Sequence, residues 1–392
     1  MSLQSELSHD ETGPGSIPRL NTLYFYLTEG CNLACRHCWL APKFDTTGHR
    51  YPTLPVELFE TAIREAKPLG LSGVKLTGGE ALLHPHFIRL LEIVRREELG
   101  LTLETNGLLC TPEIAAEIAK SPKRFVSVSI DGADAETHEW VRSVPGSFDA
   151  ARRAVTNLVA AGLRPQVIFT IMRRNAEQVD AMVHMAEQLG AASLKFNVLQ
   201  PTARGEKLHE LHETLSIAEL IQLGRHVERD LAPKTPLRLF FDYPAAFRAL
   251  NRIASGDGCG VCGILGIMGV LATGHYAMCG IGEHVPDLVF GEVGKDVLEA
   301  VWREHPIVTA LRDGLPEQLG GVCDRCLMKQ RCMGSCVAQN YYRTGNLWAS
   351  NWFCEQAEEA GLFPASRLGR RRAHPSNHSH DVTTRGLLQL PL

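Results

Sequence analysis

The chain lacks the features that mark secreted proteins, membrane proteins and general nucleic-acid binders. Its first residues, MSLQSELSHDETGPGS, contain no apolar core of the kind that a signal peptide needs. Forty basic and forty-four acidic side chains give a net charge of −4, whereas nucleic-acid binders usually carry a basic excess. Residues 258–282 have no Asp, Glu, Lys or Arg, but cysteines, a histidine and many glycines interrupt them. We therefore expect a cytoplasmic protein with neither a membrane nor a nucleic-acid partner.

The unusual feature that is present is the number of cysteines, which is 12 in a chain of 392 residues. With 44% hydrophobic and 21% charged residues, the composition is that of an ordinary globular protein. A chain of this length has room for two to three domains of about 150 residues. Because the expected compartment is reducing, clustered cysteines are expected to bind metal rather than form disulfides.

Between two polar tails, residues 1–20 and 366–392, the sequence predicts two domains, 21–235 and 236–365. In the first domain, predicted strands alternate with predicted helices, which indicates parallel strands joined by right-handed crossovers. Six such units predict an α/β fold, a partial (β/α)6 TIM-type barrel, since a full barrel needs eight. The expected strands are 21–28, 72–77, 101–105, 125–130, 166–172 and 193–199. The second domain is expected to be small and cysteine-rich, with a metal-dependent core.

Cys31, Cys35 and Cys38 form a C-x3-C-x2-C run directly after the first predicted strand. In barrels of parallel strands, active sites are built from the loops that follow the strands. Three thiolates can bind three irons of a [4Fe–4S] cluster and leave the fourth iron open to another ligand. Zinc held by the three cysteines and His37 is the alternative. The position of His37 inside the Cys35–Cys38 spacer favours the cluster.

GCNLACRHCW, together with TGGE, ETNG and SIDG further along, resembles the radical S-adenosylmethionine (SAM) enzymes over about residues 20–200. The resemblance implies that the open iron binds the amino and carboxylate groups of SAM. It also implies reductive cleavage of SAM to methionine and a 5′-deoxyadenosyl radical. Gly78, Gly79 and Glu80 match the motif that contacts the methionine amino group. One residue departs from the family pattern, because His37 stands where an aromatic residue is usual.

Further SAM contacts are expected on the polar faces of the strands, which would line the barrel lumen. Ser129, Asn106 and Arg142 are the candidates for the ribose and carboxylate groups. The alternative is that Asn106 only caps a turn and that Arg142 lies at the surface.

Eight later cysteines resemble the SPASM extension of radical SAM enzymes that modify peptides and proteins, over about residues 255–356. Eight thiolates divide into two complete sets of four, enough for two closed clusters or two structural zinc ions. With the SAM site, the resemblance implies three [4Fe–4S] clusters. The first auxiliary set is Cys259, Cys262, Cys279 and Cys336, and the second is Cys323, Cys326, Cys332 and Cys354.

No catalytic acid or base is assigned by the sequence. In sulfatase-maturing relatives an aspartate follows the cysteine that corresponds to Cys279, and here that residue is Gly280. Asp242, Glu283 and His284 remain candidates. Cys110 is expected to be a buried thiol without a catalytic role.

These features predict an oxidoreductase-type maturase that abstracts hydrogen from a peptide and crosslinks a ribosomally synthesised precursor. YLTEGCNLACRHCW and KLTGGEALLHP are most similar to peptide maturases of the SynChlorMet-cassette type. Expected partners are the precursor peptide, a reductant such as flavodoxin or ferredoxin, and a separate leader-recognition protein, because about twenty residues precede the first strand. The alternatives are a radical SAM maturase of a protein or small-molecule cofactor precursor, and a non-catalytic iron–sulfur or zinc protein.

Overall fold

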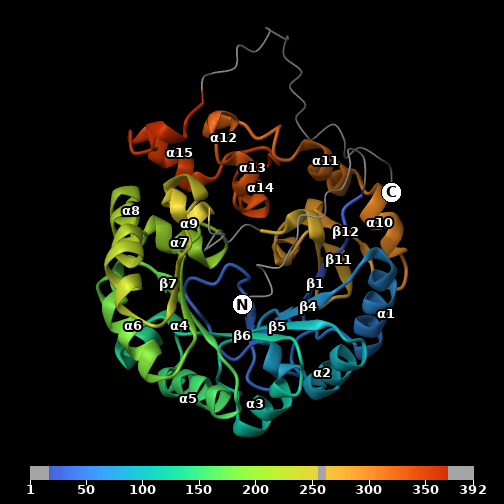
Figure 1. Cartoon of the computed structure of the whole chain (residues 1–392). Helices are drawn as coiled ribbons and strands as arrows, with labels where there is room; N and C mark the ends of the chain where they lie inside the picture. Colours follow the sequence, from blue (N-terminus) through green and yellow to red (C-terminus); the bar gives the residue numbers. More distant parts are fainter. Residues whose placement is uncertain (1–16, 255–261, 370–392) are drawn as a thin grey trace. The chain divides into compact units, whose positions relative to one another are not determined.

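The computed structural model describes residues 17–254 and 262–369, and these form two compact units (Figure 1). The first, which we call the sheet unit, contains the chain up to Tyr243 and the segment Gly263–Ala310. The second, the cysteine-rich unit, contains Pro244–Cys262 and the chain from Leu311 onward. Each unit has its own buried apolar residues.

A ten-stranded sheet organises the sheet unit, in the order β12-β11-β10-β1-β4-β5-β6-β7-β8-β9. The strands from β10 to β9 in this order are all parallel to their neighbours, and β11 and β12 add an antiparallel edge beyond β10. The strands are β1 (Thr22–Tyr26), β4 (Gly73–Thr77), β5 (Gly100–Thr105), β6 (Arg124–Ser129), β7 (Gln166–Ile171), β8 (Ser193–Val198), β9 (Arg238–Phe241), β10 (Ile267–Val270), β11 (His275–Ala277) and β12 (Val289–Glu292).

Helices cover the outer face of these strands (Figure 1). They are α1 (Val56–Ala66), α2 (Phe87–Arg96), α3 (Pro112–Ala119), α4 (Ala135–Arg142), α5 (Ser147–Ala160), α6 (Val179–Gln188), α8 (Ile217–His226) and α10 (Leu298–Glu304). The helix α7 (Arg204–Glu210) instead lies at the strand ends, where its Leu208 packs with Leu199 and Met172. Side-chain caps start several of them: Thr111 accepts from the backbone N–H of Ile114, and Asp134 accepts from that of Thr137. Such caps satisfy backbone donors that the first turn leaves unpaired.

The sheet has an apolar outer face and a partly polar inner face because side chains alternate along each strand. On β1, Leu23 and Phe25 are fully buried, and Phe25 packs on Phe59 of α1 with ring centroids 4.2 Å apart. Lys75 of β4 and Glu104 of β5 lie on the inner face. Both are only partly buried, and they form an ion pair with a distance of 2.7 Å between Lys75 Nζ and Glu104 Oε1. Charged side chains therefore line the concave side of the sheet.

The α/β fold predicted from the sequence is confirmed, and the six expected strands correspond to β1 and β4–β8. Two further parallel strands, β9 and β10, were not expected. Because β10 pairs with β1, residues 263–310 belong to the sheet unit here, whereas the sequence analysis placed them in the cysteine-rich domain.

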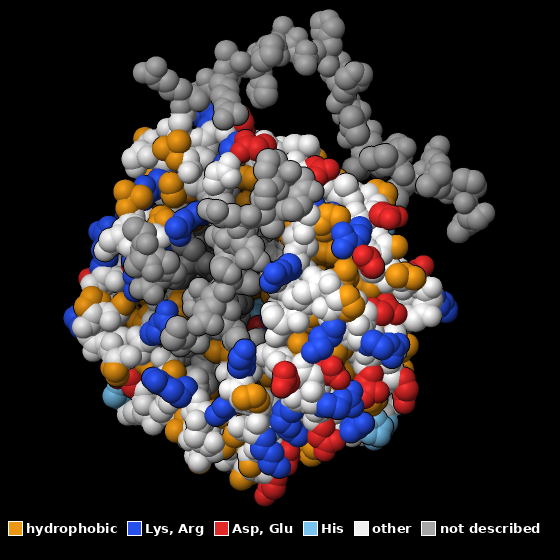
Figure 2. All heavy atoms as spheres, turned by 45° about the vertical axis from the view of Figure 1, so that its right-hand side comes forward, with side chains coloured by type: hydrophobic (Ala, Val, Ile, Leu, Met, Phe, Trp, Pro, Cys, Tyr) orange, Lys and Arg blue, Asp and Glu red, His pale blue; other side chains and the backbone are white. Residues whose placement is uncertain are grey.

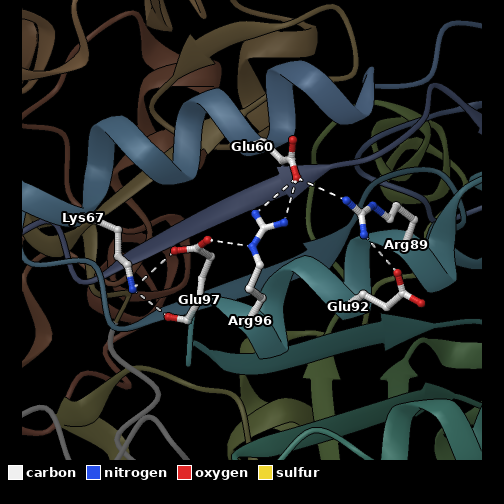
Figure 3. A network of polar contacts seen from close by, with 6 residues as sticks. All are labelled: Glu60, Lys67, Arg89, Glu92, Arg96 and Glu97. Atoms are coloured by element: carbon white, nitrogen blue, oxygen red, sulfur yellow. Dashed lines mark hydrogen bonds and ion pairs between the residues drawn. The ribbon is translucent and has the colours of Figure 1, made fainter.

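The outer surface of α1 and α2 carries a network of ion pairs in which opposite charges offset one another (Figure 3). Glu60 accepts from Arg96 at 3.2 Å, and Glu97 lies 3.1 Å from Arg96 and 3.7 Å from Lys67. Glu60 also lies 3.8 Å from Arg89, which bonds Glu92. Exposed pairs of this kind contribute little stability, about 0–1 kcal/mol each. Figure 2 likewise shows acidic and basic side chains interspersed over the right-hand part of the face in view.

The cysteine-rich unit is built from short helices: α9 (Leu250–Ala254), α12 (Gly321–Arg325), α13 (Lys329–Cys332), α14 (Val337–Thr344) and α15 (Trp352–Glu359). The helix α11 (Pro306–Gly314) leads into it. Phe247 packs against Phe353 and Phe363, with ring centroids 5.0 and 5.5 Å apart. Across the described part of the chain, no helix combines the length and apolarity needed to cross a membrane.

Candidate active site

The loop that contains Cys31, Cys35 and Cys38 lies at the carboxyl end of β1 and is closed by a short pair of strands. β2 (Gly30–Cys31) pairs in parallel with β3 (Lys43–Phe44), so the intervening residues form a closed loop. The guanidinium of Arg204 donates to the carbonyl oxygens of Cys35 and Pro42. Backbone bonds to the end of α4 add further support. The positions of the three thiols are therefore set by residues far apart in the sequence.

The donor set of this loop fits an iron–sulfur cluster. No disulfide involves Cys31, Cys35 or Cys38, and the first two are 5% and 6% exposed. N–H groups approach the sulfurs: Leu33 N donates to Cys31 Sγ at 3.4 Å, and Arg142 Nη1 donates to Cys35 Sγ at 3.5 Å. Cluster thiolates accept bonds of this kind. Burial, opposed by Arg142, raises the pKa of Cys35 to about 11, so the loop favours this thiol as a neutral group unless a metal binds it.

The GGE segment that follows β4 is bonded directly to the chain preceding Cys31. Gly79 N donates to Thr28 O at 2.8 Å, and Glu80 N donates to Gly30 O at 3.0 Å. Gly78 has φ +123°, which favours glycine, and a Cβ on Gly79 would meet Gly30 O at 1.9 Å. Only glycine therefore lets the two segments approach so closely.

The Glu80 carboxylate is buried and accepts three hydrogen bonds. Oε1 accepts from the Thr105 hydroxyl at 2.6 Å and from Leu82 N at 3.1 Å, and Oε2 accepts from Asn106 N at 2.8 Å. Burial raises the pKa of Glu80, and these bonds oppose that effect. Glu80 thus joins the ends of β4 and β5 beside the cysteine loop. This network was not anticipated from the sequence, which suggested only a contact with an ammonium group.

The remaining predicted SAM contacts lie at the same edge of the sheet. Asn106 donates to Asn32 Oδ1 at 2.7 Å and lies 3.7 Å from Cys31 Sγ, while its own Oδ1 accepts from Leu108 N. Asn106 therefore both caps a turn and faces the cysteine loop. Ser129 is the last residue of β6 and is half-buried.

Arg142 is buried rather than at the surface, which excludes the surface alternative. Its Nη2 lies 2.6 Å from Oδ2 of Asp131, a carboxylate with no exposed area. His37 Nε2 lies 3.4 Å from the same oxygen, and burial lowers the pKa of His37 to about 4. Asp131 belongs to the SIDG motif, and the motif alone gives it no role. The available signal was an aspartate placed immediately after an apolar strand.

Other charged groups line the concave face of the sheet below the loop. Lys195 of β8 lies 3.7 Å from Asp242, and both side chains are about one-third exposed. Lys75 lowers the pKa of Glu104 by its charge and its hydrogen bond, and Lys195 adds to this effect, although burial opposes it. Thr77 also donates to Glu104 at 3.4 Å. This face therefore carries donors and acceptors that can hold a polar substrate.

The segment after Cys279 contains the other candidate acid–base residues. A Cβ on Gly280 would lie 2.3 Å from the Tyr26 ring, so no larger side chain fits there without rearrangement. Glu283 reaches solvent, yet partial burial and the charge of Glu29, opposed by Lys43, raise its pKa to about 7. His284 lies 3.1 Å from Trp39 O. Glu283 therefore has a pKa that suits proton transfer near neutral pH.

All four cysteines of the second auxiliary set belong to the cysteine-rich unit. Burial raises the pKa of Cys354, and the charges of Cys323, Cys332 and Cys326 raise it further. Met328 N donates to Cys326 Sγ at 3.4 Å. Their role as cluster ligands remains a prediction.

The first auxiliary set is described only in part. Cys259 lies outside the described residues, Cys262 and Cys336 belong to the cysteine-rich unit, and Cys279 belongs to the sheet unit. Within residues 17–254 and 262–369, no three His, Cys, Asp or Glu side chains are grouped as a single metal ion would require. Cys110 is 3% exposed and burial raises its pKa to about 12, as expected for a thiol without a catalytic role.

Comparison with known sequences identifies relatives along most of the chain. A model of the radical SAM superfamily matches residues 25–188. The AdoMet-dependent heme synthase of Methanosarcina barkeri is 30% identical over 86% of this chain and 96% of that protein. The mycofactocin maturase MftC of Mycobacterium ulcerans is 30% identical over 82% of this chain and 84% of that protein.

Solved structures share the fold at lower identity. Streptococcus suis SuiB bound to precursor peptide SuiA superposes with a TM-score of 0.65 at 17% identity, over 86% of this chain and 76% of that one. Native anSMEcpe with bound AdoMet and a Cp18Cys peptide gives a TM-score of 0.65 at 19% identity, over 87% and 96%. At these identities the likeness concerns the fold alone.

Proposed function

This chain belongs to the radical SAM superfamily, and we propose that it is a SPASM-type maturase that abstracts hydrogen from a peptide substrate. The product we propose is a crosslink in a ribosomally synthesised precursor. The observation that carries this proposal is the similarity to a mycofactocin maturase over most of both chains. Membership of the superfamily implies a [4Fe–4S] cluster and SAM.

Cys31, Cys35 and Cys38 would hold the cluster of the SAM site. When bound, the cluster and SAM supply an electron and a radical able to remove hydrogen from an unactivated carbon. Cys31 and Cys35 are 5% and 6% exposed, so bulk water has little access to these two thiols. Exclusion of water protects a reactive species from side reactions.

The chain's own residues would position SAM and the substrate. The backbone of Gly78 and Gly79 leaves room for close approach of a ligand, and the carboxylate of Glu80 is fixed by three donors. A carboxylate held in this way can accept from an ammonium group without first paying an ordering cost. Lys195 and Asp242 on the concave face would hydrogen-bond polar groups of the substrate.

Two auxiliary clusters complete the proposal, with the two cysteine sets predicted from the sequence as ligands. The second set is supported by the placement of Cys323, Cys326, Cys332 and Cys354 in one unit, where each of the other three affects the pKa of Cys354. A flavodoxin- or ferredoxin-type reductant and a separate leader-recognition protein are the further partners that we propose.

A second candidate is a maturase of a small-molecule cofactor precursor. It is favoured by the similarity to an AdoMet-dependent heme synthase, which extends over 96% of that protein. The two candidates share the SAM site and differ in what occupies the concave face of the sheet.

The experiment that separates them is an anaerobic assay of the reconstituted protein with SAM and dithionite. One arm contains precursor peptides encoded beside the gene, and the other contains tetrapyrroles. We expect 5′-deoxyadenosine in the peptide arm, together with loss of two hydrogen atoms from the peptide by mass spectrometry. Turnover of tetrapyrroles alone would support the second candidate. Absence of SAM cleavage in both arms, from protein with full iron content, would support a non-catalytic iron–sulfur protein.

Iron content tests the clusters independently. We expect about twelve irons per chain in the reconstituted parent and about eight when Cys31, Cys35 and Cys38 are replaced together by Ala, because each cubane contains four. About four irons plus zinc in the parent would contradict the two auxiliary clusters. Stoichiometric zinc without iron would contradict the enzyme proposal itself.

A further inference from the structure

A buried ion pair lies directly beside one of the three cysteines of the SAM site. Arg142, at the end of α4, donates from Nη1 to Cys35 Sγ at 3.5 Å. Its other terminal nitrogen, Nη2, lies 2.6 Å from Oδ2 of Asp131. The two side chains are 8% and 0% exposed, so water screens neither charge well.

The position of Asp131 is fixed by the surrounding chain. Its Oδ1 accepts from Thr170 N at 2.7 Å, and its backbone N–H donates to His138 Nδ1 at 3.1 Å. Asn175 donates to its carbonyl oxygen at 3.0 Å. These bonds come from β7, α4 and the segment after β7. These bonds hold the Asp131 carboxylate facing the guanidinium. Arg142 therefore lies between this carboxylate and Cys35 Sγ and contacts both.

We propose that Arg142 and Asp131 form an opposed charge pair that sets the reduction potential of the cluster bound through Cys35. Arg142 raises the potential and Asp131 lowers it. This inference rests on the proposed function, since it requires Cys31, Cys35 and Cys38 to hold the cluster.

The physical reason is the charge of the cluster. A reduced cluster carries one more negative charge than the oxidised form, so a nearby cation stabilises reduction and a nearby anion opposes it. Hydrogen bonds to the cluster sulfurs act in the same direction as a cation. A low effective dielectric strengthens both effects.

Asp131 does not contact the ligand sulfur itself, and we expect its charge to lower the reduction potential from a position behind Arg142. If Asp131 only held α4 in place, removing its negative charge would not raise the reduction potential of the cluster. The two roles predict different results when each charge is neutralised by an amide of similar shape.

The test is a redox titration of the reconstituted SAM-site cluster, followed by electron paramagnetic resonance, with iron content measured in parallel. To isolate this cluster, the cysteines of the auxiliary sets are replaced by Ala in every sample. We expect Arg142→Gln to lower the midpoint potential and Asp131→Asn to raise it. The double variant should lie between the two single variants. Asp149→Asn, which removes an exposed carboxylate on α5, is the matched control and should leave the potential unchanged.

Two results would overturn the inference. Unchanged potentials in both single variants, with iron content intact, would show that the pair has no influence on the cluster. Shifts in the same direction would show that Asp131 only positions Arg142. If Asp131→Asn does not fold, Arg142→Lys decides, because it keeps the charge and should have a higher potential than Arg142→Gln. A parent protein that binds no iron would instead contradict the proposed function.

Discussion

Replacing Gly79 by Ala should separate the GGE segment from the cysteine loop. Gly79 N donates to Thr28 O at 2.8 Å and Glu80 N donates to Gly30 O at 3.0 Å, so the two segments are joined by two backbone bonds. The new Cβ would lie 1.9 Å from Gly30 O and 2.6 Å from its carbonyl carbon. Because these are backbone atoms, the clash can be relieved only if the segments move apart.

The expected cost follows from the two effects. Overpacking in a tight site costs about 1–3 kcal/mol. Each of the two hydrogen bonds contributes about 1 kcal/mol. We expect Gly79→Ala to destabilise the sheet unit by about 3–5 kcal/mol. Because Glu80 moves with this segment, SAM affinity should fall about tenfold or more, which corresponds to about 1.4 kcal/mol or more.

Gly320→Ala in the cysteine-rich unit is the matched control. Gly320 has φ −90°, and its added Cβ would find only Trp348 O at 3.6 Å, an ordinary contact. Its effect on stability should lie within about 0.5 kcal/mol. Urea unfolding, with hydrogen exchange measured on peptides from β1 and β4, reports the stability, and calorimetry reports SAM binding. A Gly79→Ala protein as stable as the control variant, with SAM affinity like the parent, would refute the reasoning.

Three further predictions concern the sheet unit. Phe59→Ala, which removes the ring packed on Phe25, should lower the free energy of unfolding by about 3–5 kcal/mol in urea titrations, and a change below about 1 kcal/mol would contradict the packing. Cys110 should resist iodoacetamide in the native metal-free protein at pH 7, since burial raises its pKa to about 12; rapid alkylation seen by mass spectrometry would show that it is accessible. His226 bonds Asp180 at 2.7 Å and a second aspartate, and these bonds raise its pKa above 6.5. Because this side chain is 36% exposed, we expect the bonds to contribute only about 0.5 kcal/mol to the free energy of unfolding. This stabilisation should be fully present below pH 6.5 and should be lost as the pH rises through the pKa of His226 in the folded protein. His226→Gln should remove this pH dependence of the urea midpoint.

The barrel portion of the fold was predictable because its signals are local. Alternation of apolar residues at β-strand and α-helix spacing located β1 and β4–β8, each within about two residues of the observed bounds. The strands β9 and β10 are only four residues long and pair with partners far away in sequence. Short strands were expected after residue 236, but nothing in a four-residue segment specifies which sheet edge it joins, so the place of β9 and β10 in this sheet was not anticipated.

The site was predictable in its residue types and less so in its contacts. The spacing of Cys31, Cys35 and Cys38 and the GGE motif identified the loop. The pairing of Arg142 with Asp131 depends on how α4 is oriented against the strands. If α4 were rotated about its axis, the guanidinium of Arg142 would point away from Asp131. The burial of both partners is a tertiary property that no local pattern contains.

The pairing of β10 with β1 also affects how the protein is made. The partner of β1 is synthesised more than two hundred residues later, after a segment that belongs to the other unit. Until that strand emerges from the ribosome, one edge of β1 presents unpaired N–H and C=O groups. A nascent chain with an open parallel edge is prone to wrong association. The final strand order thus creates a period during translation in which shielding of that edge would favour correct assembly.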